Sequence, residues 1–233
     1  IKNSKYHPKM APEKTDHYEE ESLQLAKIQK AMAIIQFKLE AEIINRRPDF
    51  EMESRLLLDK IDYENHTITL SGVTYPLIED EFPTIDPSDP YKLTVEEEAV
   101  IERLVHSFKS SVRLEDHIRF LMNKGSMYLV YNDNLLFHGC VPLSKEGKLL
   151  ETTISGKTYS GKALFDMFDQ AVRKGFIHRK REDNEMNLDL IWYLWTGPAS
   201  PLFGKTEMTT FERYYIEDKV THEEIKNMYY KLR

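Results

Sequence analysis

The sequence has little of the features that mark secreted, membrane or nucleic-acid-binding proteins. Its one cysteine, Cys140, excludes an internal disulfide framework and is typical of a protein in the reducing cytoplasm. No apolar run approaches the roughly 20 residues that a membrane-spanning helix needs. The sequence also lacks the basic segment followed by an apolar one that is typical of a secretion signal. We therefore expect no membrane partner.

Positive charge is also in short supply. Lys and Arg number 32 against 39 Asp and Glu, so the formal net charge is −7. A net acidic chain has no general attraction for nucleic acid or for anionic membranes, and neither is expected as a partner. If the ligand is anionic, a local basic pocket or a bound metal must supply the positive field.

The chain does contain enough apolar material to fold. Hydrophobic residues make up 41% of the 233 positions, and Tyr, Phe and Trp number 13, 11 and 2. A disordered chain carries fewer aromatic residues, so we expect a packed core, either one of fair size or two smaller ones. The first residue is Ile1 rather than Met, and we expect the natural N-terminus to lie elsewhere.

A long helix is predicted near the start of the chain. Asp16 and Glu19 have the spacing of a capping box, and Pro48 ends the helix after Arg46 and Arg47. Apolar residues then recur at steps of three and four, which predicts one buried face. This expected face consists of Leu25, Ile28, Met32, Ile35 and Leu39, broadened by Phe37, Ala41 and Ile44.

A hairpin and two more helices follow. Residues 67–75 alternate around Ser71-Gly72, which predicts two strands and a turn. Thr94 and Glu97 start a second helix with a capping box. Its expected inner residues are Val100, Ile101, Leu104 and Phe108. A third helix is expected over 112–125, with Leu114, Ile118 and Leu121 inward.

After Gly125 the pattern changes from helix to sheet. Residues 127–131 and 135–137 predict two strands without polar alternation, which are usually covered on both faces. A helix with Leu164, Phe165, Phe168 and Val172 is expected between Ser160 and Gly175. Residues 188–195 predict a further buried strand, and Thr221 with Glu224 predicts a C-terminal helix. The fold class is therefore α+β, with a mainly helical region before part of an α/β or sandwich core.

One segment, residues 134–142, carries candidate chemistry. Its apolar strand brings His138 to a rigid strand end, and Gly139 removes side-chain bulk from the backbone there. An imidazole is a good ligand for a borderline divalent metal. The alternative is a buried histidine bonded to backbone. Cys140 lies too close to His138 on an extended segment to ensure a Cys–His nucleophile, and we expect a small buried residue.

Residues 136–143, Leu-Phe-His-Gly-Cys-Val-Pro-Leu, resemble the fourth metal motif of calcineurin-like metallophosphoesterases. Longer segments resemble one branch, the class III (Firmicutes-type) fructose-1,6-bisphosphatases, and the resemblance extends over nearly the whole chain. These segments are residues 35–40, 56–63, 117–121, 156–164 and 192–213.

The resemblance implies a two-metal phosphomonoesterase, usually dependent on manganese. Such an enzyme removes the 1-phosphate of fructose 1,6-bisphosphate, a sugar phosphate, in gluconeogenesis. His138 would ligate one metal. Residues 1–112 would be a largely helical insertion with a β-hairpin, and residues 113–233 would form part of a metallophosphoesterase-like β-sandwich flanked by helices.

The chain departs from the family pattern at the metal motifs. Asp-x-His, Gly-Asp-x-x-Asp-Arg, Gly-Asn-His-Asp/Glu and Gly-His-Thr-Pro are all missing. By the family order, three would precede Ile1 and one would follow Arg233. One ligand cannot hold two cations, so we expect this chain to be an inactive internal portion. Its partners would be the remaining segments of the same enzyme, and homo-oligomerisation is left open.

Two further residues are weaker candidates. Lys205 lies where related phosphatases bring a loop near the phosphate, although a surface lysine is the alternative. Asp189, at the start of the expected strand, would be a partner of a metal ligand or a strand-end cap. A competing hypothesis is a regulatory or interaction module without chemistry. It predicts a closed core, a hydrogen-bonded His138, and exposed anchors along Tyr229-Tyr230 or the first helix.

Overall fold

The computed structural model describes residues 19–78, 81–178 and 184–232 and contains two compact units. The first unit consists of residues up to Arg46, Glu53–Ser107 and Thr209–Glu223. The second consists of Arg47–Met52, Phe108–Met208 and the residues from Glu224 onward. None of the described helices is both long enough and apolar enough to cross a membrane.

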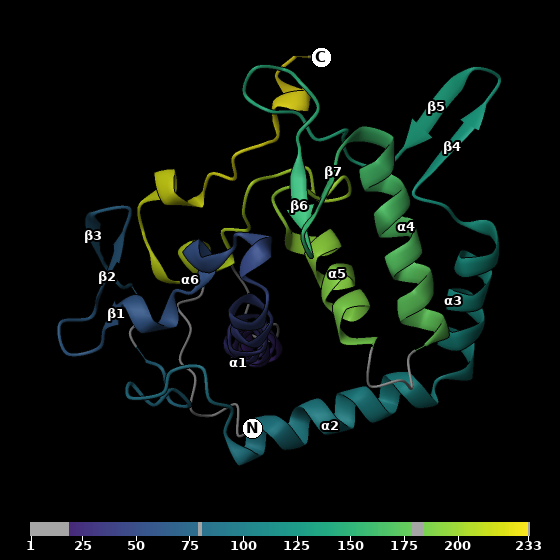
Figure 1. Cartoon of the computed structure of the whole chain (residues 1–233). Helices are drawn as coiled ribbons and strands as arrows, with labels where there is room; N and C mark the ends of the chain where they lie inside the picture. Colours follow the sequence, from purple (N-terminus) through teal and green to yellow (C-terminus); the bar gives the residue numbers. More distant parts are fainter. Residues whose placement is uncertain (1–18, 79–80, 179–183, 233) are drawn as a thin grey trace. The chain divides into compact units, whose positions relative to one another are not determined.

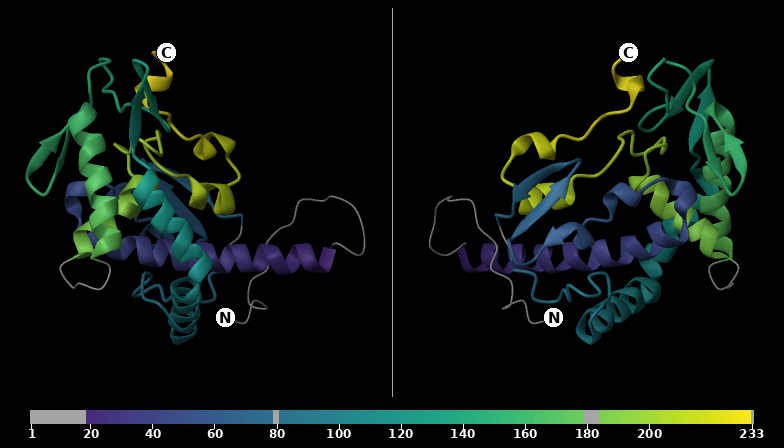
Figure 2. Two further views of the ribbon diagram at one scale, coloured as in Figure 1. Left: turned by 90° about the vertical axis from the view of Figure 1, so that its right-hand side faces the viewer. Right: turned by 60° about the vertical axis from the view of Figure 1, so that its left-hand side comes forward.

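The long helix α1 (Glu19–Arg46) has no interruption in either view of Figure 2. It ends before Pro48, as predicted, while Asp16 lies outside the described residues. The predicted inner face is only partly correct, because Leu25 and Ile28 are exposed. The residues that the helix buries are Lys30, Ala31, Ala33, Ile34, Ile35, Lys38, Ala41 and Ile44. Lys38 in this set forms an ion pair with Glu97, and the Lys30 ammonium lies 5.3 Å from the centre of the Tyr215 ring. Such contacts, which periodicity does not detect, decide part of the buried face.

The core of the first unit lies between α1, a small sheet and α6 (Thr210–Tyr215). The sheet has the antiparallel order β1 (Ile61–Asp62), β2 (Thr67–Leu70), β3 (Val73–Pro76). The strand pair β2–β3 confirms the predicted hairpin. The fully buried residues of this core include Ile34, Leu58, Ile68, Phe211 and Tyr215.

Helix α2 (Val95–Ser110) begins with the predicted capping box. The Glu97 carboxylate accepts from the Thr94 amide, and the Glu97 amide donates to the Thr94 hydroxyl. The inner face predicted for this helix is wrong at Leu104 and Phe108, which are exposed in the described structure. Glu97 is the buried residue instead, because it pairs with a lysine of α1.

In the second unit, α3 (Val112–Lys124) ends at Gly125 as predicted, although Leu121 on its expected inner face is exposed. Helices α4 (Gly161–Ile177) and α5 (Glu185–Thr196) lie side by side (Figure 1). The inner residues predicted for α4 are confirmed, except that Val172 is half-buried. Gly175 lies inside α4 rather than ending it. A Cβ at this position would lie 2.7 Å from the Ile191 side chain of α5.

The predicted strand over 188–195 is wrong, because this segment lies within α5. Its run of apolar residues has no period that separates a strand from a helix. The helix buries Leu190, Tyr193 and Leu194, while Trp195 is 71% exposed. The predicted C-terminal helix is also wrong, because Lys219–His222 and Met228–Tyr230 form only short 3-10 turns.

Two hairpins complete the second unit. β4 (Tyr128–Tyr131) pairs with β5 (Asn134–Phe137), as predicted. The second hairpin, β6 (Thr152–Ile154) with β7 (Lys157–Tyr159), was not predicted. The expectation that both faces of β4–β5 are covered is wrong for the described structure. More than half of each side chain is exposed for Leu129, Val130, Tyr131, Leu135 and Leu136.

The α+β class is confirmed, with helices beside three small antiparallel sheets. The metallophosphoesterase-like sandwich stays a prediction, because the described strands form separate sheets of two or three strands. The domain boundary at residue 112 also stays a prediction.

Candidate functional site

His138 directly follows β5, so the strand end positions it as predicted. The residue is exposed and lines a cavity of about 730 Å³. Within the described residues the imidazole has no hydrogen-bond or ion-pair partner. The cavity is bordered by the end of α3, the β4–β5 hairpin and α4. The imidazole nitrogens are therefore available to a ligand.

The backbone after His138 lies directly on a second segment of the same unit. Gly139 has φ +77°, and a Cβ built on it would lie 2.2 Å from the carbonyl oxygen of Pro201. The Cys140 amide donates to that same oxygen at 2.9 Å. The glycine is required both by its left-handed conformation and by the close backbone approach.

Cys140 is fully buried, which confirms the expectation of a small buried residue. Loss of water contact raises the pKa of its thiol to about 11. The thiol is the nucleophile only after it loses its proton, and burial favours the protonated form. Cys140 is therefore a packing residue at neutral pH.

The cavity wall opposite the hairpin carries an ion pair between Arg173 and Asp169 of α4. The Arg173 Nε lies 2.6 Å from the Asp169 carboxylate, which also accepts from the Met127 amide. Arg173 further donates to the carbonyl groups of Met122, near the end of α3, and of Gly125, the residue that follows the helix. The hydrogen bonds and charge of Asp169 raise the pKa of Arg173. The pair fixes the end of α3, and its two charges offset one another, while Lys124 also lines the cavity.

A metal site does not form from the described residues alone. They contain no group of three or more His, Cys, Asp or Glu side chains that could hold an ion. A tetrahedral or octahedral cation needs more protein ligands than one histidine. His138 could serve as one ligand, and the rest would have to come from elsewhere.

The two weaker candidates lie outside the cavity. The Lys205 ammonium forms an ion pair with Glu224 and lies 5.5 Å from the centre of the Phe203 ring. Asp189 belongs to α5 rather than to a strand, so its predicted role as a strand-end cap is wrong. Its buried carboxylate accepts from the Arg47 Nε at 2.8 Å. These contacts do not test the role of Lys205 near the phosphate or that of Asp189 as a partner of a metal ligand, and both roles stay predictions.

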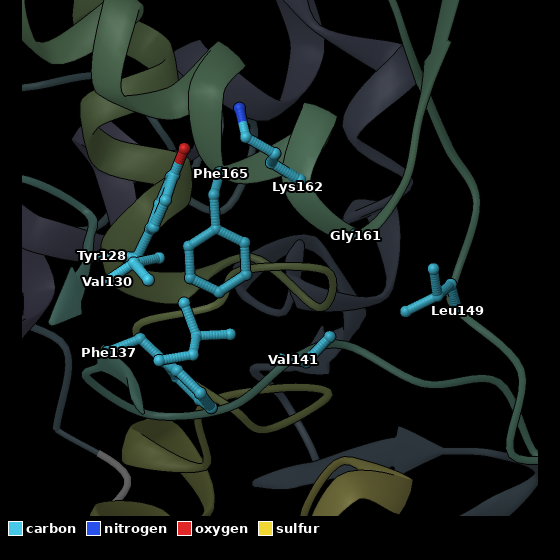
Figure 3. Close-up of a pocket in the computed structure, with 9 residues that line it drawn as sticks. Tyr128, Val130, Phe137, Val141, Leu149, Gly161, Lys162 and Phe165 are labelled. Carbon is cyan, nitrogen blue, oxygen red and sulfur yellow. The ribbon is translucent and has the colours of Figure 1, made fainter. Parts of the chain in front are cut away.

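A second cavity, of about 290 Å³, lies on the other face of the β4–β5 hairpin (Figure 3). Phe165 of α4 makes edge contacts with the rings of Tyr128 and Phe137 there. Lys162 at the border is held by Asp166 at 2.6 Å. The lining is otherwise apolar, so both faces of the hairpin border hollows rather than a closed core. The hypothesis of a phosphatase fragment predicts a cleft beside His138 that is open to further segments, with exposed apolar surface where those segments pack, whereas the apolar strand pattern alone predicts covering layers.

The sequence model of a family described as Firmicute fructose-1,6-bisphosphatase matches residues 2–233. Proteins named fructose-1,6-bisphosphatase class 3 are similar over most of the chain. The protein from Clostridium botulinum (strain Alaska E43 / Type E3) is 55% identical over 210 residues, which cover 90% of this chain and 32% of that protein. The one from Listeria innocua serovar 6a is 52% identical over 214 residues, with coverages of 91% and 33%.

The protein of that name from Staphylococcus aureus (strain JH9) is 50% identical over 232 residues, which cover 99% of this chain and 35% of the relative. The chain thus spans about a third of the length of the curated relatives it matches. No solved structure matches the sequence significantly.

Proposed function

Because the chain belongs to the Firmicute fructose-1,6-bisphosphatase family, we propose that it is part of a class 3 fructose-1,6-bisphosphatase. The proposed reaction is hydrolysis of the 1-phosphate of fructose 1,6-bisphosphate, a step of gluconeogenesis in the cytoplasm. The similar proteins carry this enzyme's name, and the chain matches about a third of each. The observation that supports the proposal within the structure is an exposed imidazole, His138, at the end of a strand beside a large cavity.

We further propose that His138 is one ligand of a manganese site whose other ligands lie outside this sequence. The described residues supply no complete ligand set, so the chain by itself is expected to be inactive. When bound, such a metal would supply positive charge for the phosphoryl oxygens and a more acidic water. The chain's own contribution is to hold one imidazole at a fixed place on a metallophosphoesterase-like core.

The apolar hairpin supports the view that further polypeptide packs here. Leu129 and Leu136 form a cross-strand pair on one face, and Val130 and Leu135 form one on the other. All four are exposed, although burying such side chains stabilises a protein by about 1.5–3 kcal/mol each. An exposed apolar patch of this kind marks a surface that another segment covers. The missing part of the enzyme is the proposed occupant.

The competing hypothesis of a module without chemistry predicts a hydrogen bond for His138 and a closed core around the hairpin. The described residues give His138 no such bond and leave the hairpin open. Family membership also favours the enzyme. We therefore retain the phosphatase as the proposed function, with a sugar phosphate as substrate and neither nucleic acid nor membrane as partner. Homo-oligomerisation is compatible with this proposal.

The proposal is tested by phosphate release from fructose 1,6-bisphosphate. The longer enzyme, which includes this chain and has the length of its relatives, should hydrolyse the substrate. Manganese should stimulate the reaction. The 233-residue chain, measured at equal concentration, should release no phosphate above the buffer rate. Absence of hydrolysis by the longer enzyme with manganese present would reject the proposed function.

A further inference from the structure

The segment that follows α5 forms a tight turn that contacts the backbone of Gly139 and Cys140, the two residues after His138. It runs from Gly197 to Gly204 and is held by its own backbone, with the Ser200 amide donating to the Gly197 carbonyl at 3.0 Å. The Gly204 amide in turn donates to the Ser200 carbonyl at 3.2 Å. We refer to residues 197–204 as the support turn.

The side chain of Ser200 organises this turn. Ser200 is 1% exposed, and its hydroxyl donates to the Leu194 carbonyl of α5 at 2.5 Å. The same oxygen accepts from the amides of Leu202 and Phe203, each at 3.1 Å. One hydroxyl thus joins the helix to the two residues after Pro201. A buried hydroxyl with three partners fixes the backbone more firmly than packing alone.

The support turn is anchored at its other side as well. The hydroxyl of Tyr193, a buried residue of α5, accepts from the Ala199 amide at 3.1 Å. Gly197 lies against the Tyr193 ring, where a Cβ would come within 2.5 Å of ring carbons. The turn is therefore a rigid extension of α5 rather than a loose loop.

The His138 segment rests on this turn by backbone contact. The Cys140 amide donates to Pro201 O, and the Gly139 backbone lies so close to Pro201 and Leu202 that no side chain fits. Cys140 is also buried, and its sulfur would lie 3.4 Å from a Cβ built on Gly204, at the other end of the support turn. His138, which precedes Gly139 and Cys140, is exposed. The backbone contact after it therefore fixes the position of its side chain relative to the support turn.

We propose that the support turn, through Ser200 and Gly139, positions the His138 imidazole for its ligand. Ser200 and Gly139 are positioning residues, because both act through the backbone of the His138 segment. The inference rests on the proposed function for the identity of the ligand. The mechanical part, that the turn holds the segment, can be tested without metal.

The test uses the single cysteine as a local reporter in the 233-residue chain. The variant Gly139→Ala places a methyl group against Pro201 O. The matched control Gly156→Ala also has a positive φ, +74° against +77°, but has no atom within 4 Å of the new Cβ. Both variants therefore carry the same backbone strain, and only one loses the contact with the turn. Ser200→Ala removes the organising hydroxyl.

The measurement is the rate of Cys140 modification by a disulfide reagent in EDTA, with far-UV circular dichroism to monitor folding. We expect Gly139→Ala and Ser200→Ala to raise the rate about tenfold or more over wild type, because local opening exposes the thiol. Gly156→Ala should react at the wild-type rate. If Gly139→Ala does not fold, Ser200→Ala decides. Folded variants that keep Cys140 protected like the control would overturn the proposal.

The longer enzyme links the turn to the ligand. There, the affinity for manganese, measured by calorimetry, should fall about 10- to 100-fold in Gly139→Ala and stay unchanged in Gly156→Ala. If Cys140 becomes reactive while manganese affinity is unchanged in both Gly139→Ala and His138→Ala, the assignment of the ligand fails and the turn remains a structural support. If His138→Ala lowers the manganese affinity and Gly139→Ala does not, the positioning role is overturned and the proposed function stands.

Discussion

The Lys38 ammonium lies 2.8 Å from the Glu97 carboxylate, and both side chains are wholly buried. Lys38 also donates to the Thr84 carbonyl at 2.6 Å, while the Glu97 carboxylate accepts from the amide of Thr94, the residue before α2. This pair joins α1 to the start of α2 within the first unit. It also explains why a lysine occupies a position of α1 that packing would assign to an apolar residue.

Removing one partner of this pair should be strongly destabilising. Lys38→Met leaves a buried carboxylate without its cation, and we expect the free energy of unfolding to fall by about 3–5 kcal/mol. The double variant Lys38→Met with Glu97→Leu should recover much of that loss, because no charge remains uncompensated. The exposed pair Glu115–Arg119 is the control, and Arg119→Ala should change the value by less than about 0.5 kcal/mol. Urea denaturation measures all three, and a Lys38→Met effect no larger than the control contradicts this account.

The helical assignment of residues 188–195 makes Tyr193 central to the second unit. Its ring stacks on the Phe168 ring, with 5.8 Å between the ring centres, and contacts the Phe50 ring, with 4.8 Å between the centres. Tyr193→Ala should lower the free energy of unfolding by about 3–5 kcal/mol. Tyr193→Phe should lower it by only about 1–3 kcal/mol, by leaving the Ala199 amide without its acceptor. Trp195→Ala, at an exposed position of the same helix, should be close to neutral in the same urea titration, whereas a buried strand would make residue 195 as sensitive as 193.

The local signals in the sequence sufficed for elements with clear ends. Pro48 gave the end of α1, the capping box of Thr94 and Glu97 gave the start of α2, and Ser71-Gly72 gave the hairpin of the first unit. These features act over four or five residues, so no tertiary context is needed to interpret them.

The failures came where tertiary contacts decide. A mainly apolar segment such as residues 188–195 is compatible with a buried strand and with a helix. Packing against α4, where Tyr193 stacks on Phe168, selects the helix. The buried Lys38 depends on a residue 59 positions away. At the candidate site, the placement of His138 followed from the strand pattern, but the support from Pro201 and Ser200 joins segments far apart in sequence. No spacing rule reveals such a contact.

Burial of Cys140 predicts a specific loss of stability in alkaline solution. Its thiol has a pKa of about 11 in the folded chain, against an ordinary 9.0. Above pH 9 the unfolded chain releases this proton while the folded chain keeps it, so the free energy of unfolding falls as pH rises from about 9 to 11. The loss amounts to at most about 3 kcal/mol.

The measurement is urea denaturation of wild type and Cys140→Ala at several values between pH 8 and about 10. Wild type should lose stability relative to the variant over this range. Burial also raises the pKa of Tyr193, but that residue is present in both proteins and cancels in the comparison. Parallel pH profiles for the two proteins would show that the thiol is not shielded from water.

The central claim is that His138 presents its imidazole to a metal in the complete enzyme. The most direct measurement is manganese-dependent phosphate release from fructose 1,6-bisphosphate by the longer enzyme, comparing His138→Ala with His178→Ala, an exposed histidine of the same unit. The account predicts that His138→Ala lowers kcat/KM by about 100-fold or more and weakens manganese binding, while His178→Ala behaves as wild type. Wild-type activity and manganese affinity in His138→Ala would contradict it.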